Sequence, residues 1–314
     1  MRLGFVCILV LAGMLGFQCR AWADESVTVV LSEDGGVYGE FAVQLGSILG
    51  QHSSAKVALR VVPLSNLKDE PPARSGQNPL VVAVGTPAMT AMARRPLTVP
   101  VLNVLVPRAS FRSVARSSPR TQDSKLFSAV FFDQPWARQL ALIRHAAPGR
   151  RVGILLGKDS ADLSAMLQAA ARDAQMVAVI ETVTDEADLL PALKRLLPAS
   201  DALLAVPDAT IYNRSNIATI LLTSYRAKVP LFGFSPAYVK AGALAAVYSH
   251  PGQIAQQVAE IILSLPGTGS LPAPQSPRYF SVNVNPQVRM SLELNMDDDV
   301  QLQQKLKQVP ENAP

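Results

Sequence analysis

Short runs of apolar residues alternate along the chain with stretches in which apolar residues recur at helical spacing. The first run is Val27–Leu31, and the stretch that follows, Tyr38–Leu49, places Phe41, Leu45 and Ile48 on one helical face. Runs that are apolar throughout are typical of strands buried on both faces of a parallel sheet. The pattern therefore predicts an α/β protein in which strands and helices alternate.

Two such series follow one another along the chain. The predicted strands of the first are Val27–Leu31, Val57–Val62, Leu80–Val84, Val101–Val106 and Leu126–Phe132, and they are followed by a helix at Trp136–Ala147. The second has strands Arg151–Leu156, Met176–Glu181, Ala202–Val206 and Val229–Phe232 around helices Asp159–Ala174, Glu186–Leu197 and Ala209–Arg226. The remainder adds a strand, Ala243–Val247, a helix, Gln253–Leu265, and a strand, Tyr279–Val284. This order predicts two Rossmann-like, doubly wound domains with helices on both faces of each sheet.

Length and composition fit this architecture and exclude several functions. The 314 residues suffice for two domains, and 49% hydrophobic with 17% charged residues allow large cores. A net charge of +5 with only 6% aromatic residues does not favour a nucleic-acid partner. The histidines, His52, His145 and His250, are far apart, which does not favour a zinc site. The sequence has neither a P-loop nor a Gly-x-Gly-x-x-Gly motif, so we expect neither a metal site nor a cofactor.

The N-terminal segment has the features of a cleaved secretory signal peptide. Arg2 precedes an apolar run, Leu3–Phe17, and Ala21–Ala23 supplies the small residues of a cleavage site. The run is too short for a spanning helix of about 20 residues. Both cysteines, Cys7 and Cys19, lie in this segment, so the exported chain would have no thiol. We therefore expect residues 1–23 to be removed and the protein to be soluble in the periplasm.

Several motifs resemble those of the substrate-binding components of ABC importers, more closely a periplasmic group that includes binders of aromatic amino acids. The motifs are Pro148–Leu155, Leu203–Asp208, Lys228–Phe234, Val239–Ala246 and Val282–Asn285. The resemblance extends over roughly Val27–Met296. It implies a fold like that of type I periplasmic binding proteins, in which two hinged lobes close on a ligand.

The resemblance also implies where the lobes divide. Residues 24–134 with about 242–278 would form the N-terminal lobe, and residues 135–241 with about 279–296 the C-terminal lobe. Crossovers are expected near 133–136, 234–242 and 277–282. Beyond Met296 the composition turns polar, which predicts a flexible tail over residues 297–314.

The chain departs from the family where a ligand would be held. Family members commonly have an Asn-x-Thr-Gly signature in the fifth strand, where this chain has Ser128–Phe131. Pro107–Ser110 replaces an Asp-Pro turn after the fourth strand. The identity of the ligand is therefore not carried over from the family.

Ligands of open parallel sheets bind beyond the carboxyl ends of the strands, where helix N-termini favour anions. This rule predicts a set of ligand-binding residues that follow individual strands: Ser32, Tyr38, Gly85, Thr86, Ala88, Asp133, Gln134, Asp208, Tyr212 and Ser235, with Asp159 and Ser160 opening a helix nearby. Most have a second interpretation. Thr86, Asp159 and Asp208 also suit helix caps, Tyr38 suits packing, and Asp133 suits either a ligand amine or the cap of the next helix.

The segment Pro107–Lys125 is strongly basic. Arg108, Arg112 and Arg116 recur every four residues and would share one helical face. This face is either simply solvated or attracts an acidic ligand or partner.

No catalytic set is evident. Gly233–Ala237 superficially resembles a nucleophile elbow around Ser235, but Ala237 stands where the last glycine is required and Pro236 would hinder the required helix start. We therefore expect no enzyme. The leading hypothesis is a periplasmic solute-binding protein, monomeric, that passes a small molecule such as an amino acid to an inner-membrane ABC permease. The alternative is a degenerate binding-protein fold that serves as an interaction or sensory module.

Overall fold

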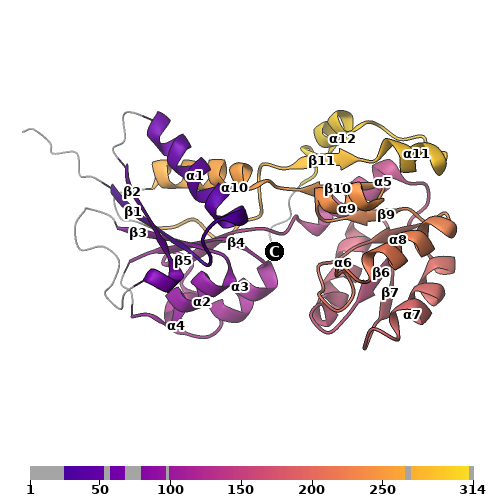
Figure 1. The fold of residues 1–314 in the computed structure, drawn as a ribbon, viewed down its shortest axis with the longest axis horizontal. Coiled ribbons are helices and arrows are strands. Elements are labelled where there is room, and N and C mark those ends of the chain that lie inside the picture. Colours follow the sequence, from indigo (N-terminus) through magenta and orange to yellow (C-terminus); the bar gives the residue numbers. More distant parts are fainter. Residues whose placement is uncertain (1–24, 53–56, 68–78, 97–98, 266–269, 311–314) are drawn as a thin grey trace, which may run out of the picture.

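The computed structural model describes residues 25–52, 57–67, 79–96, 99–265 and 270–310. The expected signal peptide lies outside the described residues. The described elements form two groups, each built on one sheet, and Figure 1 shows the groups side by side along the long axis.

The first sheet has five parallel strands in the order β2-β1-β3-β4-β5. Its strands are β1 (Glu25–Leu31), β2 (Val57–Pro63), β3 (Leu80–Val84), β4 (Val101–Val106) and β5 (Phe127–Phe131). Its helices are α1 (Gly36–Gln51), η1 (Leu64–Asn66), α2 (Thr86–Arg94), α3 (Arg108–Ala115), α4 (Pro119–Gln122) and, from much later in the chain, α10 (Pro251–Ser264).

Both faces of the first sheet are covered, which explains why its inner strands are apolar throughout. Phe41 and Leu45 of α1 and Val258 of α10 pack on one face. Met89 of α2 and Phe111 of α3 pack on the other. Burial on both faces removes the alternation that a half-exposed strand would show.

The second sheet has six strands in the order β11-β10-β9-β8-β6-β7, all parallel except the edge strand β11. Its strands are β6 (Arg151–Leu156), β7 (Val177–Thr182), β8 (Ala202–Leu204), β9 (Leu231–Gly233), β10 (Ala245–Tyr248) and β11 (Ser281–Val284). Its helical segments are α5 (Trp136–Ala146), η2 (Ala161–Leu163), α6 (Ser164–Asp173), α7 (Leu189–Leu196), η3 (Leu197–Ala199), α8 (Ile217–Arg226), α9 (Pro236–Ala241), α11 (Pro286–Ser291) and α12 (Asp299–Leu306).

Helices again cover both faces. Leu140 of α5, Leu167 of α6 and Leu302 of α12 belong to one core cluster, and Leu193 of α7 and Ile220 of α8 belong to the cluster on the other face. The prediction of two doubly wound α/β units is confirmed.

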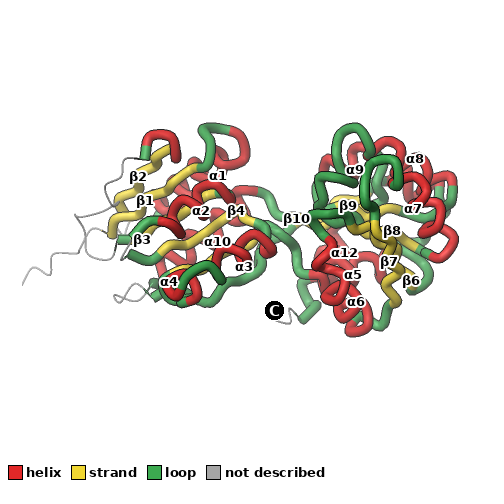
Figure 2. The backbone as a smooth tube through the Cα atoms, turned by 90° about the horizontal axis from the view of Figure 1, so that it is seen from below, coloured by secondary structure: helices red, strands yellow, loops and turns green. Residues whose placement is uncertain are grey.

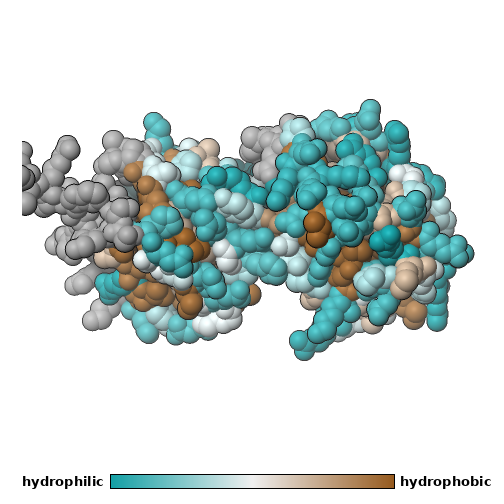
Figure 3. All heavy atoms as spheres, turned by 90° about the horizontal axis from the view of Figure 1, so that it is seen from above, coloured by the Kyte–Doolittle hydropathy of each residue, from teal (hydrophilic) through white to brown (hydrophobic). Residues whose placement is uncertain are grey.

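Three crossovers connect the two groups. The chain passes from β5 to α5 at residues 132–135, from β10 to α10 at 249–250, and back to β11 at about 276–280. In Figure 2 the connecting loops lie together beside β10. Viewed from above, the molecule is narrower between the groups, and mostly hydrophilic side chains cover that part (Figure 3).

The assignment of residues 242–278 to the N-terminal lobe is wrong for β10. This strand pairs with β9 and β11 in the second sheet, and only the following helix, α10, packs against α1. The middle crossover therefore falls at residues 249–250 and not at 234–242. A short apolar strand such as β10 fits either sheet equally well, so the sequence pattern alone does not assign it.

The expectation of a flexible tail over 297–314 is also wrong for the part described. Residues 299–306 form α12, and its Leu302 and Leu306 are buried in the core of the second group. Asp298 starts the helix through a capping box with Gln301. Two leucines four residues apart are enough to dock a helix that is otherwise polar.

Three helices, α6, α7 and α8, begin later than predicted. Residues 209–216 form turns in front of α8, because the side-chain oxygen of Asn213 accepts from the N–H groups of Ser215 and Asn216. A 3-10 turn, η2, precedes α6. Asparagine and serine side chains compete with the helix for such backbone groups. Among the described helices, none is long and apolar enough to cross a membrane.

Candidate functional site

Four predicted residues meet at the carboxyl ends of β1 and β3. The hydroxyl of Ser32 donates to the Val84 carbonyl at 2.7 Å and accepts from the Ala88 N–H at 3.0 Å. Gly85 has φ of +88°, and a Cβ there would lie 2.6 Å from Ser32 Oγ and 2.8 Å from the Tyr38 ring. The backbone at Gly85 therefore lets Ser32 and Tyr38 approach, and only glycine fits.

Thr86 does not cap α2. The cap position is Gly85, which has no side chain, and Thr86 is the first helical residue. The oxygen that satisfies a free N–H of the first turn comes from Ser32, which follows the neighbouring strand β1. Ser32, which is distant in sequence from α2, therefore acts as its N-terminal cap.

Asp133 accepts a hydrogen bond from the first residue of α3. Its carboxylate accepts from the backbone N–H of Arg108, the first residue of α3, so it does not cap the helix that follows it. The Arg108 guanidinium lies 4.5 Å from the Phe131 ring centre and donates to Ser276 Oγ at 2.7 Å. Burial raises the pKa of Asp133, although the N–H and positive charge of Arg108 oppose this shift.

The raised pKa predicts a stabilising substitution. Because the folded state holds the Asp133 proton more tightly than the unfolded chain, unfolding becomes easier as pH rises from the ordinary pKa through the folded one. Asp133→Asn keeps an acceptor for the Arg108 N–H and removes the charge. We expect a higher melting temperature than wild type at pH 7.5 and a smaller difference near pH 4, measured by thermal denaturation. A lower melting temperature at pH 7.5 would contradict this account of Asp133.

Gln134 belongs to a buried network that joins all three crossovers. Its Nε2 donates to the hydroxyl of Ser249, 2.8 Å away, and that hydroxyl donates to the Tyr279 carbonyl at 2.6 Å. Arg138, on α5, donates to Gln134 Oε1 at 2.6 Å and to the Pro277 carbonyl at 2.9 Å, and lies over the Phe280 ring. The side-chain amide of Gln134 therefore takes part in hydrogen bonds that connect the crossovers.

Arg138 and Ser249 are two residues of this network that the sequence pattern did not predict. Arg138 is 2% exposed, and its burial lowers its pKa to about 10. An arginine within the apolar face of the helix Trp136–Ala147 was the available signal. No sequence signal pointed to Ser249, because its hydrogen-bond partners, Gln134 and Tyr279, are distant in sequence.

Asp208 is buried at the edge of the second sheet. Its Oδ2 accepts from Ser160 Oγ at 2.7 Å, from Asp159 N at 3.1 Å and from Gly157 N at 3.2 Å. Its Oδ1 accepts from Thr210 N at 2.9 Å. Asp208 therefore ties the loop after β6 to the loop after β8, and Asp159 takes part through its backbone.

An aromatic cluster lies beside this edge. The rings of Tyr212, Phe234 and Tyr238 contact one another with centres 4.4–6.3 Å apart, and the Tyr238 hydroxyl donates to the Tyr212 carbonyl at 3.2 Å. Burial raises the pKa of Tyr238 to about 12 and also raises that of Tyr212, so both remain protonated at neutral pH. Ser235 is half-buried at the start of α9, and its side chain makes no cap hydrogen bond.

The arginines of the basic segment do not form one continuous surface. Arg108 is turned onto Phe131, and Arg120 donates to the Val99 carbonyl at 3.2 Å. Arg112 is partly exposed on α3, and Arg116, which follows the helix, is exposed. The idea of a broad basic docking face is therefore weakened, because Arg108 and Arg120 are bonded to the protein's own groups.

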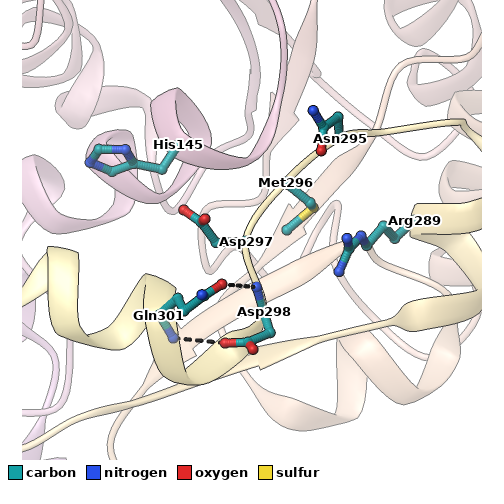
Figure 4. A pocket seen from close by; sticks show the side chains of 7 residues that line it. All are labelled: His145, Arg289, Asn295, Met296, Asp297, Asp298 and Gln301. Atoms are coloured by element: carbon teal, nitrogen blue, oxygen red, sulfur yellow. Dashed lines mark hydrogen bonds between the residues drawn. The ribbon is translucent and has the colours of Figure 1, made fainter.

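A polar pocket of about 350 Å³ lies elsewhere, near the end of α5 that leads into the start of β6. It is lined by His145, Arg289, Asn295, Met296, Asp297, Asp298 and Gln301 (Figure 4). The pKa of His145 is lowered by burial and by nearby Arg144 and Lys305. Since a helix feeding a parallel strand ends at the amino edge of the sheet, this pocket is not at the carboxyl edge, and none of the predicted site residues lines it.

Comparison with known protein families decides the class of the protein. A family model described as ABC transporter substrate binding protein matches residues 67–304. The chain belongs to the ABC transporter substrate-binding protein family. Members of this family are ligand-binding components of ABC transport, and the resemblance inferred from the sequence motifs is confirmed. A comparison with curated proteins found no match.

Several solved structures of binding proteins have a fold similar to that of this chain. A domain from Streptococcus pneumonia in complex with L-Trp is 16% identical, with a TM-score of 0.57 over 88% of this chain and 97% of that one. The ligand-free, open form of a substrate-binding protein with adhesive properties from Clostridium difficile is 14% identical, with a TM-score of 0.65 over 87% and 96%. An arabinose-binding protein from Geobacillus stearothermophilus is 12% identical, with a TM-score of 0.52 over 85% and 99%. At these identities the similarity concerns the fold alone.

Proposed function

We propose that this protein captures a small molecule between its two α/β groups in the periplasm and delivers it to an inner-membrane ABC permease. The groups would act as two lobes that close on the ligand, and the protein would act as a monomer without catalysis. Export would follow from the N-terminal segment, which has the charge, apolar run and cleavage site of a signal peptide.

The observation that carries this proposal is the joining of two parallel sheets by three short crossovers that share one hydrogen-bonded network. Such a connection allows rotation about one region while each sheet stays intact. A ligand that contacts both groups only in the closed form shifts the population toward closure by its differential affinity.

The carboxyl edges of the two sheets supply complementary groups. The first offers Tyr38, Thr86 and the half-buried carboxylate of Asp133, and the second offers Tyr212, Tyr238 and Ser235. A carboxylate and an aromatic wall suit a small molecule with an amine and an apolar part, such as an amino acid. The structural relative with bound L-Trp supports this class of ligand.

The test combines calorimetry with small-angle scattering against a panel of amino acids and nucleosides. We expect one class to bind with micromolar or tighter affinity and to reduce the radius of gyration. A panel without any binder, or binding without compaction, would count against capture by closure.

A variant pair locates the site. Asp133→Asn should weaken binding of an amine-bearing ligand by about tenfold or more, because a charge-assisted hydrogen bond contributes roughly 1.5–3 kcal/mol. Asp173→Asn, at the far end of α6, serves as the matched control and should leave the affinity unchanged. Equal affinities of the Asp133 variant and wild type would place the ligand elsewhere.

A further inference from the structure

The loop after β6 forms a nest of hydrogen-bond donors around a single oxygen atom. The N–H groups of Gly157 and Asp159 and the hydroxyl of Ser160 all point at Oδ2 of Asp208, at 3.2, 3.1 and 2.7 Å. Three converging donors that follow a strand and precede a helical turn are the arrangement by which α/β folds bind external anions. Here the anion belongs to the protein itself.

The fit of this internal carboxylate is close. A Cβ added to Gly157 would lie 2.7 Å from Asp208 Oδ1 and 2.9 Å from Oδ2, so the backbone of the loop is in contact with the carboxylate. Asp208 is 5% exposed, and its described partners are backbone N–H groups and one hydroxyl. All three donors around Oδ2 are therefore in hydrogen-bond contact with the protein's own carboxylate.

We propose that Asp208 is a specificity-determining residue that occupies this donor nest and so excludes acidic ligand groups from the loop after β6. The part of a ligand that meets this loop is therefore neutral or positively charged. The statement about the ligand rests on the function proposed above, whereas the statement about the nest does not.

The nest is tested with inorganic phosphate and formate, followed by calorimetry and by the amide signals of Gly157 and Asp159 in NMR spectra. Asp208→Ala empties the nest and removes the shared acceptor of its donors, although the Gly157 N–H also has Ser160 Oγ as an acceptor 3.1 Å away. We expect this variant to bind formate or phosphate at least tenfold more tightly than wild type, with shifts at both amides. Wild type should show no shift at either amide.

Asp208→Asn is the matched control, because it removes the charge and keeps the nest filled. It should gain no anion binding, which separates occupancy of the nest from a general change in charge. A gain in Asp208→Asn equal to that in Asp208→Ala, or a folded Asp208→Ala with no gain, would overturn the proposal.

If Asp208→Ala does not fold, the same NMR titration of the wild-type protein with phosphate tests the proposal. Shifts of the Gly157 and Asp159 amides on adding phosphate to wild type would show that the nest is open and would overturn the proposal, and unchanged signals would support a closed nest. Failure of the amino-acid panel would leave these results unaffected, so the two proposals fail separately.

Discussion

Replacing Arg138 with alanine is expected to lower the free energy of unfolding by about 3 kcal/mol or more. The guanidinium is buried, donates to Gln134 Oε1 and to the Pro277 carbonyl, and lies 4.0 Å from the centre of the Phe280 ring. Its removal leaves two buried acceptors without this donor and opens a cavity between the first and third crossovers. The change is measured as a shift of the urea denaturation midpoint.

Arg144→Ala is the control, since Arg144 is exposed on the same helix. It should change the free energy of unfolding by no more than about 0.5 kcal/mol. Arg138→Lys should fall between the two, because an ammonium keeps the charge and loses the planar fork that reaches both acceptors. A wild-type midpoint for Arg138→Ala would show that the network contributes little to stability.

The strands of this fold were predictable because parallel sheets covered on both faces leave uninterrupted apolar runs. Val101–Val106 is buried along its whole length and was visible in the sequence as such a run. Strand β10 shows the limit of this signal. Its residues are equally apolar, and its place in the second sheet depends on pairing with β9 and β11.

The sequence predicted which residues lie at the edge of each sheet, but it did not predict the hydrogen bonds that they make. The rule that loops after parallel strands share an edge correctly placed Ser32, Tyr38, Gly85 and Ala88 together. It could not show that Ser32 caps α2 or that Asp208 is held by residues about 50 positions earlier. Such bonds depend on the register between neighbouring strands, which local patterns do not encode. The tail was misjudged for a related reason, because its two apolar positions matter only when the partner surface is known.

The second large effect is expected from substitutions in α12, the helix formed by residues 299–306. Leu302 and Leu306 are 0% and 1% exposed and pack, with α5, into the core of the second group. Truncating a buried leucine costs about 2–5 kcal/mol, so Leu302→Ala with Leu306→Ala should remove most of the free energy that docks α12. Gln303 Nε2 also donates to the Phe280 carbonyl at 2.7 Å, and undocking would break this bond.

The expected result is a helix that detaches while the sheets stay folded, because α12 follows the last described strand, β11, and belongs to neither sheet. Amide hydrogen exchange should show loss of protection over residues 299–306 and lowered protection near Phe280, with little change in the first group. Val300→Ala serves as the control, since Val300 is 60% exposed on the same helix and should leave protection unchanged. Retained protection in the double variant would mean that the Asp298 capping box and the polar contacts of α12 hold the helix without its leucines, which would contradict a docking driven by apolar burial.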